Sequence, residues 1–209
     1  MNYEKSQEAL SESCQLVKKI QGKLKVIHKQ IKVSVNRDFS NLEQLDHDVR
    51  GIKIVASHMF MFGSIYPPLS KAWWIEGITT FKLQDELEPL PDFDQIMRKP
   101  YFLLAHKLFT NLSKKEITSM LALQHEIGCI QRRIAPKAHI SVLTPLSINW
   151  WIEGAKSLGL EGIFIDKPPL DVSELTKQIR MKIDILKRET EKQKIANQYR
   201  AQDTGALTA

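Results

Sequence analysis

The chain has 209 residues, of which 43% are hydrophobic and 26% are charged, a balance typical of a globular protein that buries a core. It contains no run of eighteen apolar residues, and the N-terminal sequence MNYEKSQEALSESC lacks the layout of a signal peptide, so we expect a cytoplasmic protein. Two distant cysteines and six scattered histidines argue against a disulfide framework and a zinc site.

The net charge of +6 is concentrated at the two ends of the chain. Residues 1–37 carry eight Lys or Arg and three acids, a net of +5, whereas residues 38–166 have a net of −2 and residues 167–209 a net of +3. A basic segment is expected in a protein that binds DNA, because neutralised phosphates release counterions. Basic helix faces exposed to water explain the same charge equally well.

The first predicted element is an amphipathic helix over residues 3–21, with Leu10, Cys14 and Val17 at helical spacing and Gly22 as its end. The following sequence, KLKVIHKQIKVSVN, is rich in β-branched residues, which favour strands. Within it QIKVSVN alternates strictly, with its apolar side chains on one face. We therefore predict a short β-strand here, followed by a turn at residues 36–40 and a helix.

An internal repeat occupies the middle of the chain. SIYPPLSKAWWIEGITTFKL (64–83) and SVLTPLSINWWIEGAKSLGL (141–160) align without gaps at an offset of 77 and contain all four tryptophans. Each Pro-Leu-Ser predicts a helix entry in which the serine caps the first turn. Adjacent tryptophans project about 100° apart on a helix, so we interpret the pairs as core anchors in preference to a nucleobase-stacking platform.

Residues 98–133 predict two helices, the first opened by Pro100 and the second capped by Ser113 in a capping box with Glu116. A charged helix over 172–199 follows, with a narrow apolar seam suited to docking or dimerisation. We expect a single helical domain over 1–209, divided into an N-terminal helix (1–22), a DNA-binding ribbon with following helices (23–63), a helical core (64–170), a C-terminal charged helix (171–200) and a disordered tail (201–209).

Motifs for catalysis are absent from the sequence. There is no Gly-rich phosphate loop, no Gly-x-Ser-x-Gly and no His-Glu-x-x-His. Glu76 and Glu153 occupy matching repeat positions, but a carboxylate beside glycine in such a segment more often has a capping or surface role. We expect a protein without enzymatic activity, cofactor or metal.

The polar face of the predicted strand indicates a route to DNA binding. Two such strands, one from each protomer of a dimer, would form a ribbon that fits the major groove, where Lys, Gln, Asn and Ser can contact base edges. An edge strand whose lysine prevents aggregation fits the pattern equally well. The candidate DNA-binding residues are Lys25, Lys29 and Arg37 for phosphates, with Gln30, Lys32, Ser34 and Asn36 toward the bases.

The stretches SIYPPLSKAWWIEGITTF and KPYFLLAHKLFTNLSKKEITSMLALQHEIGCIQRR resemble a family encoded on integrating conjugative elements and conjugative plasmids, which includes the AcaB-type transcriptional activators. The resemblance covers roughly residues 50–135 and rests on hydrophobic motifs. It implies a DNA-binding regulator with a ribbon-helix-helix-like element and no enzymatic activity. The repeated Trp-Trp-Ile-Glu-Gly departs from the family pattern.

Together these observations predict a mainly α fold with a short β-ribbon near the N-terminus, a ribbon-helix-helix-like element embedded in a larger helical domain. We expect a dimeric DNA-binding regulator that activates conjugative transfer genes. Its expected partners are double-stranded DNA, a second copy of the chain and other conjugation regulators, and no association with a membrane is expected. The alternative is a non-enzymatic helical interaction protein, or a subunit of a conjugation or secretion assembly.

Overall fold

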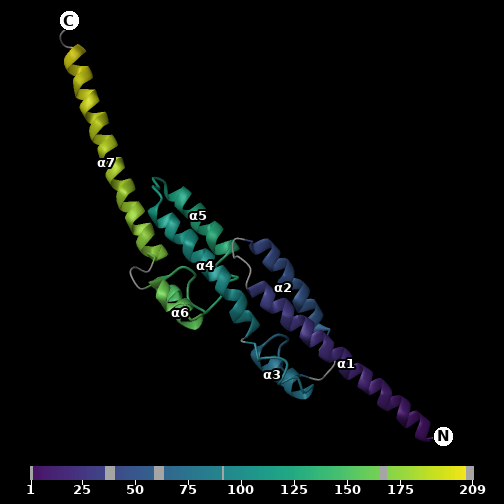
Figure 1. Cartoon of the computed structure of the whole chain (residues 1–209). Coiled ribbons are helices and arrows are strands. Elements are labelled where there is room, and N and C mark those ends of the chain that lie inside the picture. The colour runs from purple at the N-terminus through teal and green to yellow at the C-terminus, as the bar shows by residue number, and fades with distance from the viewer. Residues whose placement is uncertain (1, 36–40, 59–63, 91, 165–168, 206–209) are drawn as a thin grey trace. The chain divides into compact units, whose positions relative to one another are not determined.

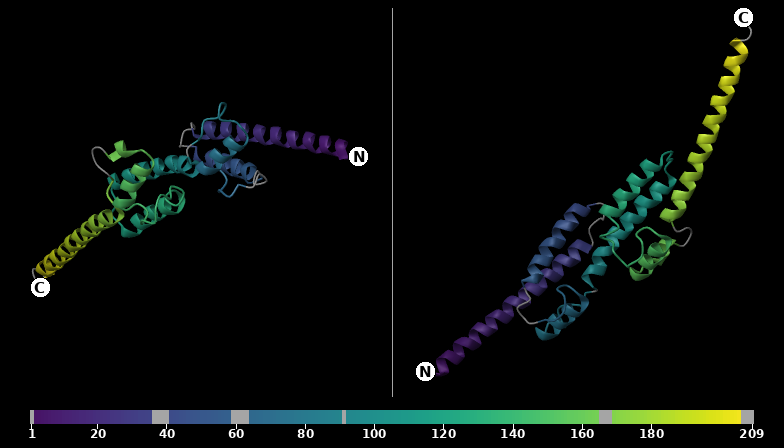
Figure 2. Two further views of the ribbon diagram at one scale, coloured as in Figure 1. Left: turned by 90° about the horizontal axis from the view of Figure 1, so that it is seen from below. Right: turned by 180° about the vertical axis from the view of Figure 1, so that it is seen from behind.

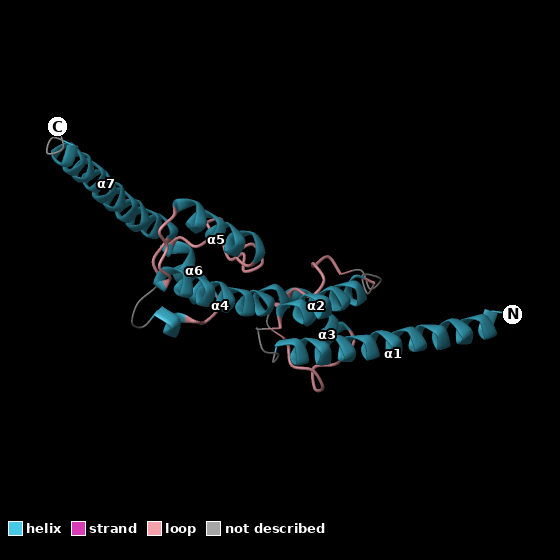
Figure 3. Ribbon diagram, turned by 90° about the horizontal axis from the view of Figure 1, so that it is seen from above, coloured by secondary structure: helices cyan, strands magenta, loops and turns pink. Residues whose placement is uncertain are grey.

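The protein is helical in every part that its computed structural model describes, which is residues 2–35, 41–58, 64–90, 92–164 and 169–205. No residue in these ranges lies in a β-strand (Figure 3). The elements in chain order (Figure 1) are α1 (Asn2–Val35), α2 (Leu42–Ser57), α3 (Lys71–Thr80), α4 (Phe93–Lys114), α5 (Met120–Arg133), α6 (Ile148–Ser157), the short 3₁₀ helix η2 (Glu161–Phe164) and α7 (Val172–Gly205).

The expected β-ribbon is wrong, because α1 continues through Gly22 and through the whole QIKVSVN stretch. The side chains that α1 buries follow a helical period and not an alternating one: Ile31 is 1% exposed and Ser34 is 3% exposed, whereas Val33 is 49% exposed. Tertiary packing of this stripe overrides the preference of β-branched residues for strands. A ribbon-helix-helix-like element is therefore excluded from the described N-terminal region.

The chain divides into two compact units, residues 1–104 and 105–209, and α4 contributes its first part to one and its second part to the other. In unit 1, α1 packs side by side with α2 (Figures 1 and 2). The start of α4 is joined to α2 by a hydrogen bond from the Tyr101 hydroxyl to the Asp46 carboxylate and by an ion pair of 3.7 Å between Lys53 and Asp94. These contacts fix the position of α2 within its unit.

Each tryptophan helix is entered through a turn with an unusual backbone. Leu69 and Leu146 have φ angles of 71° and 68°, in the left-handed region that normally favours glycine. In both turns a proline precedes the leucine, and the serine after it donates its N–H to the carbonyl three residues back, as in a type II turn. The strain of roughly 1–2 kcal/mol is offset because both leucine side chains are buried.

The predicted helix entries and core anchors are confirmed. Ser70 accepts a hydrogen bond of 3.2 Å from the N–H of Trp73, and Ser147 accepts one of 3.3 Å from the N–H of Trp150. All four tryptophans are at most 1% exposed. Within each pair the rings meet edge to face, with centroids 5.1 Å apart in α3 and 4.6 Å apart in α6.

The structure extends the repeat well beyond the tryptophan segments. His28 of α1 meets Trp74 edge to face at 6.2 Å, and His106 of α4, 78 positions later, meets Trp151 in the same way at 5.6 Å. The buried positions of the preceding helices match at the same spacing. The pairs are Leu24 with Phe102, Ile27 with Ala105 and Ile31 with Phe109 between α1 and α4, and Leu45 with Leu123 and Ile52 with Ile130 between α2 and α5. Each unit thus repeats one arrangement of a long helix, a second helix and a tryptophan helix.

Three further local predictions are corrected. Pro100 lies inside α4, which begins at Phe93, where the Asp92 side chain accepts hydrogen bonds from the N–H groups of Asp94 and Gln95. Ser113 also lies inside α4 and donates to the Thr110 carbonyl, so it does not cap the next helix. The C-terminal helix α7 extends to Gly205, into the segment expected to be disordered.

We expect replacement of Ser147 by Ala to lower the free energy of unfolding by about 1 kcal/mol, because an N-terminal N–H of α6 loses its cap. Urea unfolding followed by tryptophan fluorescence measures this change. Ser173→Ala removes an exposed hydroxyl on α7 and is the matched control, expected to shift stability by less than about 0.5 kcal/mol. Equal effects of the two changes would contradict the capping role.

Candidate interaction surface

The predicted DNA-binding residues that the structure describes all lie on α1, but their surroundings differ. Lys25 forms an ion pair with Glu86, and Lys32 lies 3.7 Å from Glu88, in the loop after α3. Ser34 is buried and its hydroxyl lies 3.5 Å from an Asp48 oxygen. Asn36 and Arg37 lie outside the described residues.

Lys29 and Gln30, also predicted, line a groove between α1 and α2 together with Ser34. The groove has a volume of about 370 Å³ and is also lined by Val33, His47, Asp48, Gly51 and Ile52. Most of its wall is apolar, with the polar groups of Lys29, His47 and Asp48 around it. A groove of this size and lining can receive an apolar side chain while its polar groups orient the molecule that carries it.

Gly51 and Ser34 keep this groove open. A Cβ atom added to Gly51 would meet no atom within 4 Å, so the space beside this helix position is empty. Ser34 is small, and its counterpart 78 positions later is the buried Leu112. Gly51 corresponds in the same way to Cys129. Unit 1 therefore has small residues at two positions where unit 2 has larger ones.

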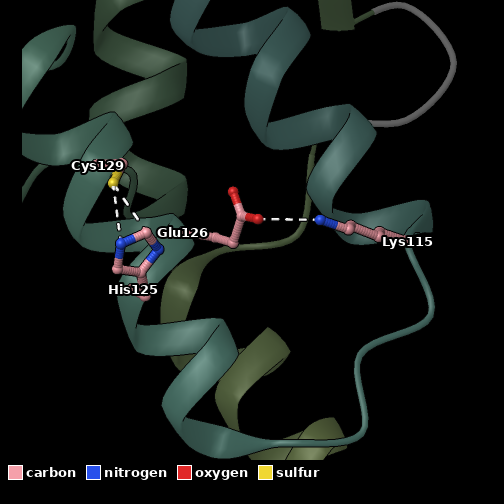
Figure 4. Close-up of polar contacts among 4 residues, drawn as sticks. All are labelled: Lys115, His125, Glu126 and Cys129. Atoms are coloured by element: carbon pink, nitrogen blue, oxygen red, sulfur yellow. Dashed lines mark hydrogen bonds and ion pairs between the residues drawn. The ribbon is translucent and has the colours of Figure 1, made fainter.

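The equivalent face of α5 in unit 2 carries polar contacts (Figure 4). Glu126, which corresponds to Asp48, accepts a hydrogen bond of 2.9 Å from Lys115 at the start of the α4–α5 connection. This bond and the positive charge of Lys115 lower the pKa of Glu126 below its ordinary value. The sulfur of Cys129 lies 3.9 Å from His125 Nε2, and both side chains are exposed. The two repeats have thus diverged at this face.

The remaining candidate groups lie in different surroundings. Glu76 is half-buried in unit 1 and Glu153 is exposed in unit 2, so the two carboxylates differ in their surroundings. Burial lowers the pKa of His106, which packs against Trp151.

Among the described residues, no three His, Cys, Asp or Glu side chains gather as ligands for a metal ion. None of the described helices combines the length and apolarity needed to span a membrane.

The sequence pointed to the α1 residues that line the groove, but as DNA contacts. It did not point to the α2 residues that line the groove. A signal was present, because His47-Asp48 and His125-Glu126 recur 78 positions apart in the two helices that line these faces. The sequence signal of the repeat is strongest around the tryptophans, where identity is highest. Gly51 did not indicate a groove in the sequence, since a glycine inside a predicted helix indicates a possible end of that helix.

Comparison of the chain with models of protein families, with curated proteins and with solved structures gives no match.

Tyr101 provides a test of how α2 is held against α4. Burial, followed by the hydrogen bond to Asp46 and the charge of that carboxylate, raises the pKa of Tyr101 above its ordinary value near 10. Above pH 10 the unfolded chain loses this proton while the folded protein keeps it, so the free energy of unfolding must fall as pH rises. Urea unfolding between pH 8 and 11 measures the slope.

We expect Tyr101→Phe to be less stable by about 1 kcal/mol at pH 8, because one hydrogen bond is lost. Its stability should then decline less steeply above pH 10 than that of the wild type. Tyr199→Phe is the matched control, since Tyr199 is 67% exposed on α7. A Tyr101→Phe variant with the same slope as the wild type would contradict the raised pKa.

Proposed function

We propose that the protein is a non-enzymatic helical interaction protein, in which the groove of unit 1 binds an amphipathic helix of a partner protein. The observation that carries this proposal is the groove between α1 and α2, with its apolar wall and its open position at Gly51. Two adjacent helices with small residues between them are suited to receive a third helix, because its side chains can enter the gap.

The exposed surface around the groove supports this function. Val26 and Val33 on α1 are 53% and 49% exposed, and Ile54 on α2 is 59% exposed. Val26, Gln30 and Val33 share one face of α1, and His47, Gly51 and Ile54 share one face of α2, by helical spacing. At the corresponding positions unit 2 has Asn111 in place of Val33 and Arg132 in place of Ile54.

Charge indicates which kind of helix would bind. The segment 23–33 contains Lys23, Lys25, Lys29 and Lys32 and no acid, and the ion pairs of Lys25 with Glu86 and of Lys32 with Glu88 reduce its net charge from +4 to +2. An amphipathic helix with acidic residues beside its apolar face would therefore be favoured over a basic one.

The test is photo-crosslinking in the cells that produce the protein, with a benzophenone amino acid in place of Val33. Adducts to a defined protein are expected from Val33, and few or none from the same probe at Asn111 in unit 2. Gly51→Leu should abolish the Val33 adducts by filling the groove. This change replaces an interior helix glycine, so it should raise helix stability by roughly 0.5–1 kcal/mol.

Because the blocking variant is expected to fold at least as well as the wild type, loss of adducts cannot be attributed to unfolding. Thermal unfolding by circular dichroism checks this point. Equal adducts from Val33 and Asn111, or adducts that survive Gly51→Leu, would overturn the proposal. Adducts to nucleic acid alone would do the same.

A second function, binding of duplex DNA by α1, is favoured by one observation. Lys18, Lys25, Lys29 and Lys32 recur at helical spacing and lie on one exposed face of this long helix. DNA binding by α1 cannot use a β-ribbon, because α1 is a helix. The ion pairs of Lys25 with Glu86 and of Lys32 with Glu88 also reduce the positive charge that α1 offers to phosphates.

Salt dependence distinguishes this second function. A protein that makes several phosphate contacts should lose on the order of 10³-fold in affinity between 50 and 200 mM salt. Fluorescence anisotropy with a labelled duplex measures it, and Lys18→Ala with Lys29→Ala should reduce the slope by about 2. Lys182→Ala with Lys187→Ala, on α7, is the matched control. A slope near zero for the wild type would exclude DNA as the partner.

A further inference from the structure

The acid that lines the groove between α1 and α2 already has donors within the chain. One oxygen of Asp48 accepts a hydrogen bond of 3.0 Å from the Gln44 amide, and the other lies 3.5 Å from the Ser34 hydroxyl. The His47 ring lies 3.9 Å from the same carboxylate. Both oxygens of Asp48 are thus engaged by this chain, so Asp48 is not the group that most needs a partner from outside.

The base that lines the groove has no such engagement. Lys25 and Lys32 come before and after Lys29 along α1, and they form ion pairs with Glu86 and Glu88. Lys29 itself is exposed and lines the groove, and it has no hydrogen bond or ion pair with any residue that the structure describes. Its positive charge is therefore the unmatched charge of the groove.

The ammonium group of Lys29 belongs to a residue one helical turn from the apolar wall. Lys29 and Val33 are four residues apart on α1, about 6 Å along its axis, and both line the groove with Gly51 of α2. Gln30, next to Lys29, also lines the groove and can donate amide hydrogens. The groove thus combines an apolar gap with a cation and an amide one turn away.

A helix that lies in the groove would remove water from part of the Lys29 side chain. Loss of water around an unpaired cation opposes binding, whereas an acid of the partner beside that cation offsets the loss. A base of the partner at the same place would add repulsion. Lys29 is therefore placed to discriminate between partner helices that fill the apolar gap equally well.

We propose that Lys29 determines the specificity of the groove, and that the partner helix carries an Asp or Glu three or four residues from the apolar side chain that enters beside Gly51. This inference rests on the proposed function of the groove. The carboxylate accepts hydrogen bonds from the Lys29 ammonium group and the Gln30 amide. The spacing follows from the groove, because residues three or four apart on a helix share a face and lie one turn apart.

Unit 2 provides the matched control position. Lys107 occupies the position of Lys29, 78 residues later, and is also exposed. Cys129 takes the place of Gly51 there. Unit 2 thus has the lysine but lacks the open position of the groove, so reversal of charge at Lys107 tests the effect of charge alone.

The experiment selects binders to the full chain from a displayed library of amphipathic helical peptides. Counter-selection against Gly51→Leu keeps only the peptides that need the groove. These peptides should be enriched in an Asp or Glu three or four residues from a large apolar residue. Selection on Lys29→Glu should place Lys or Arg at that same position, whereas selection on Lys107→Glu should return the wild-type motif.

Binding of a single selected peptide gives the magnitude. By fluorescence anisotropy, Lys29→Glu should bind it about tenfold more weakly than the wild type, because an attraction becomes a repulsion. The same peptide with its acid changed to lysine should recover most of this loss on Lys29→Glu. Circular dichroism verifies that every variant is folded.

Groove-dependent peptides without an acid at this spacing would overturn the proposal. So would the wild-type motif recovered from Lys29→Glu, or an equal change of motif on Lys107→Glu. Failure here is separable from failure of the proposed function. Peptides that depend on Gly51 without preference for an acid leave the groove as a helix-binding site and remove only the role of Lys29. A library that yields no peptide dependent on Gly51 removes the function as well.

Discussion

Burial of two adjacent tryptophans on a short helix is the constraint from which each unit is built. Side chains next to each other on a helix project in different directions, so both can be buried only if neighbouring elements cover two sides. The long helix provides one cover, with His28 against Trp74 in unit 1 and His106 against Trp151 in unit 2. The turn before each tryptophan helix buries a leucine in the same unit. The left-handed backbone of Leu69 and Leu146 is tolerated because this geometry places the side chain in the core.

The helices at the two ends of the repeat differ from the repeated pattern. Met97 and Tyr101 of α4 are buried in unit 1, but the equivalent positions of α1 are Lys19 and Lys23. At the other end, α7 has charged residues at the positions that correspond to aromatic side chains of α4: Arg180 for Phe102, Asp184 for His106 and Lys187 for Phe109. Neither α1 nor α7 can therefore serve in a further unit of the same kind. The free half of each helix is available for another type of contact.

The differences between the two units indicate function, because both units have the same arrangement of helices. The same two-helix face carries an open groove in unit 1, whereas in unit 2 a larger residue stands at each of two equivalent positions and an ion pair crosses the surface. A structural role common to both units would not account for this difference.

The sequence by itself determined the elements whose signals are local. The tryptophan pairs, their serine caps and their burial followed from Pro-Leu-Ser and from the size of the side chains, because a cap needs only neighbouring residues. The C-terminal charged helix followed from its composition. Tertiary structure alone decided the state of QIKVSVN, since its β-branched residues fit a strand locally but its stripe of Ile27, Ile31 and Ser34 is buried in a helix. It also decided the groove, because Ser34 and Gly51 come together only when α1 packs on α2, and no pattern along the chain records the space between two helices.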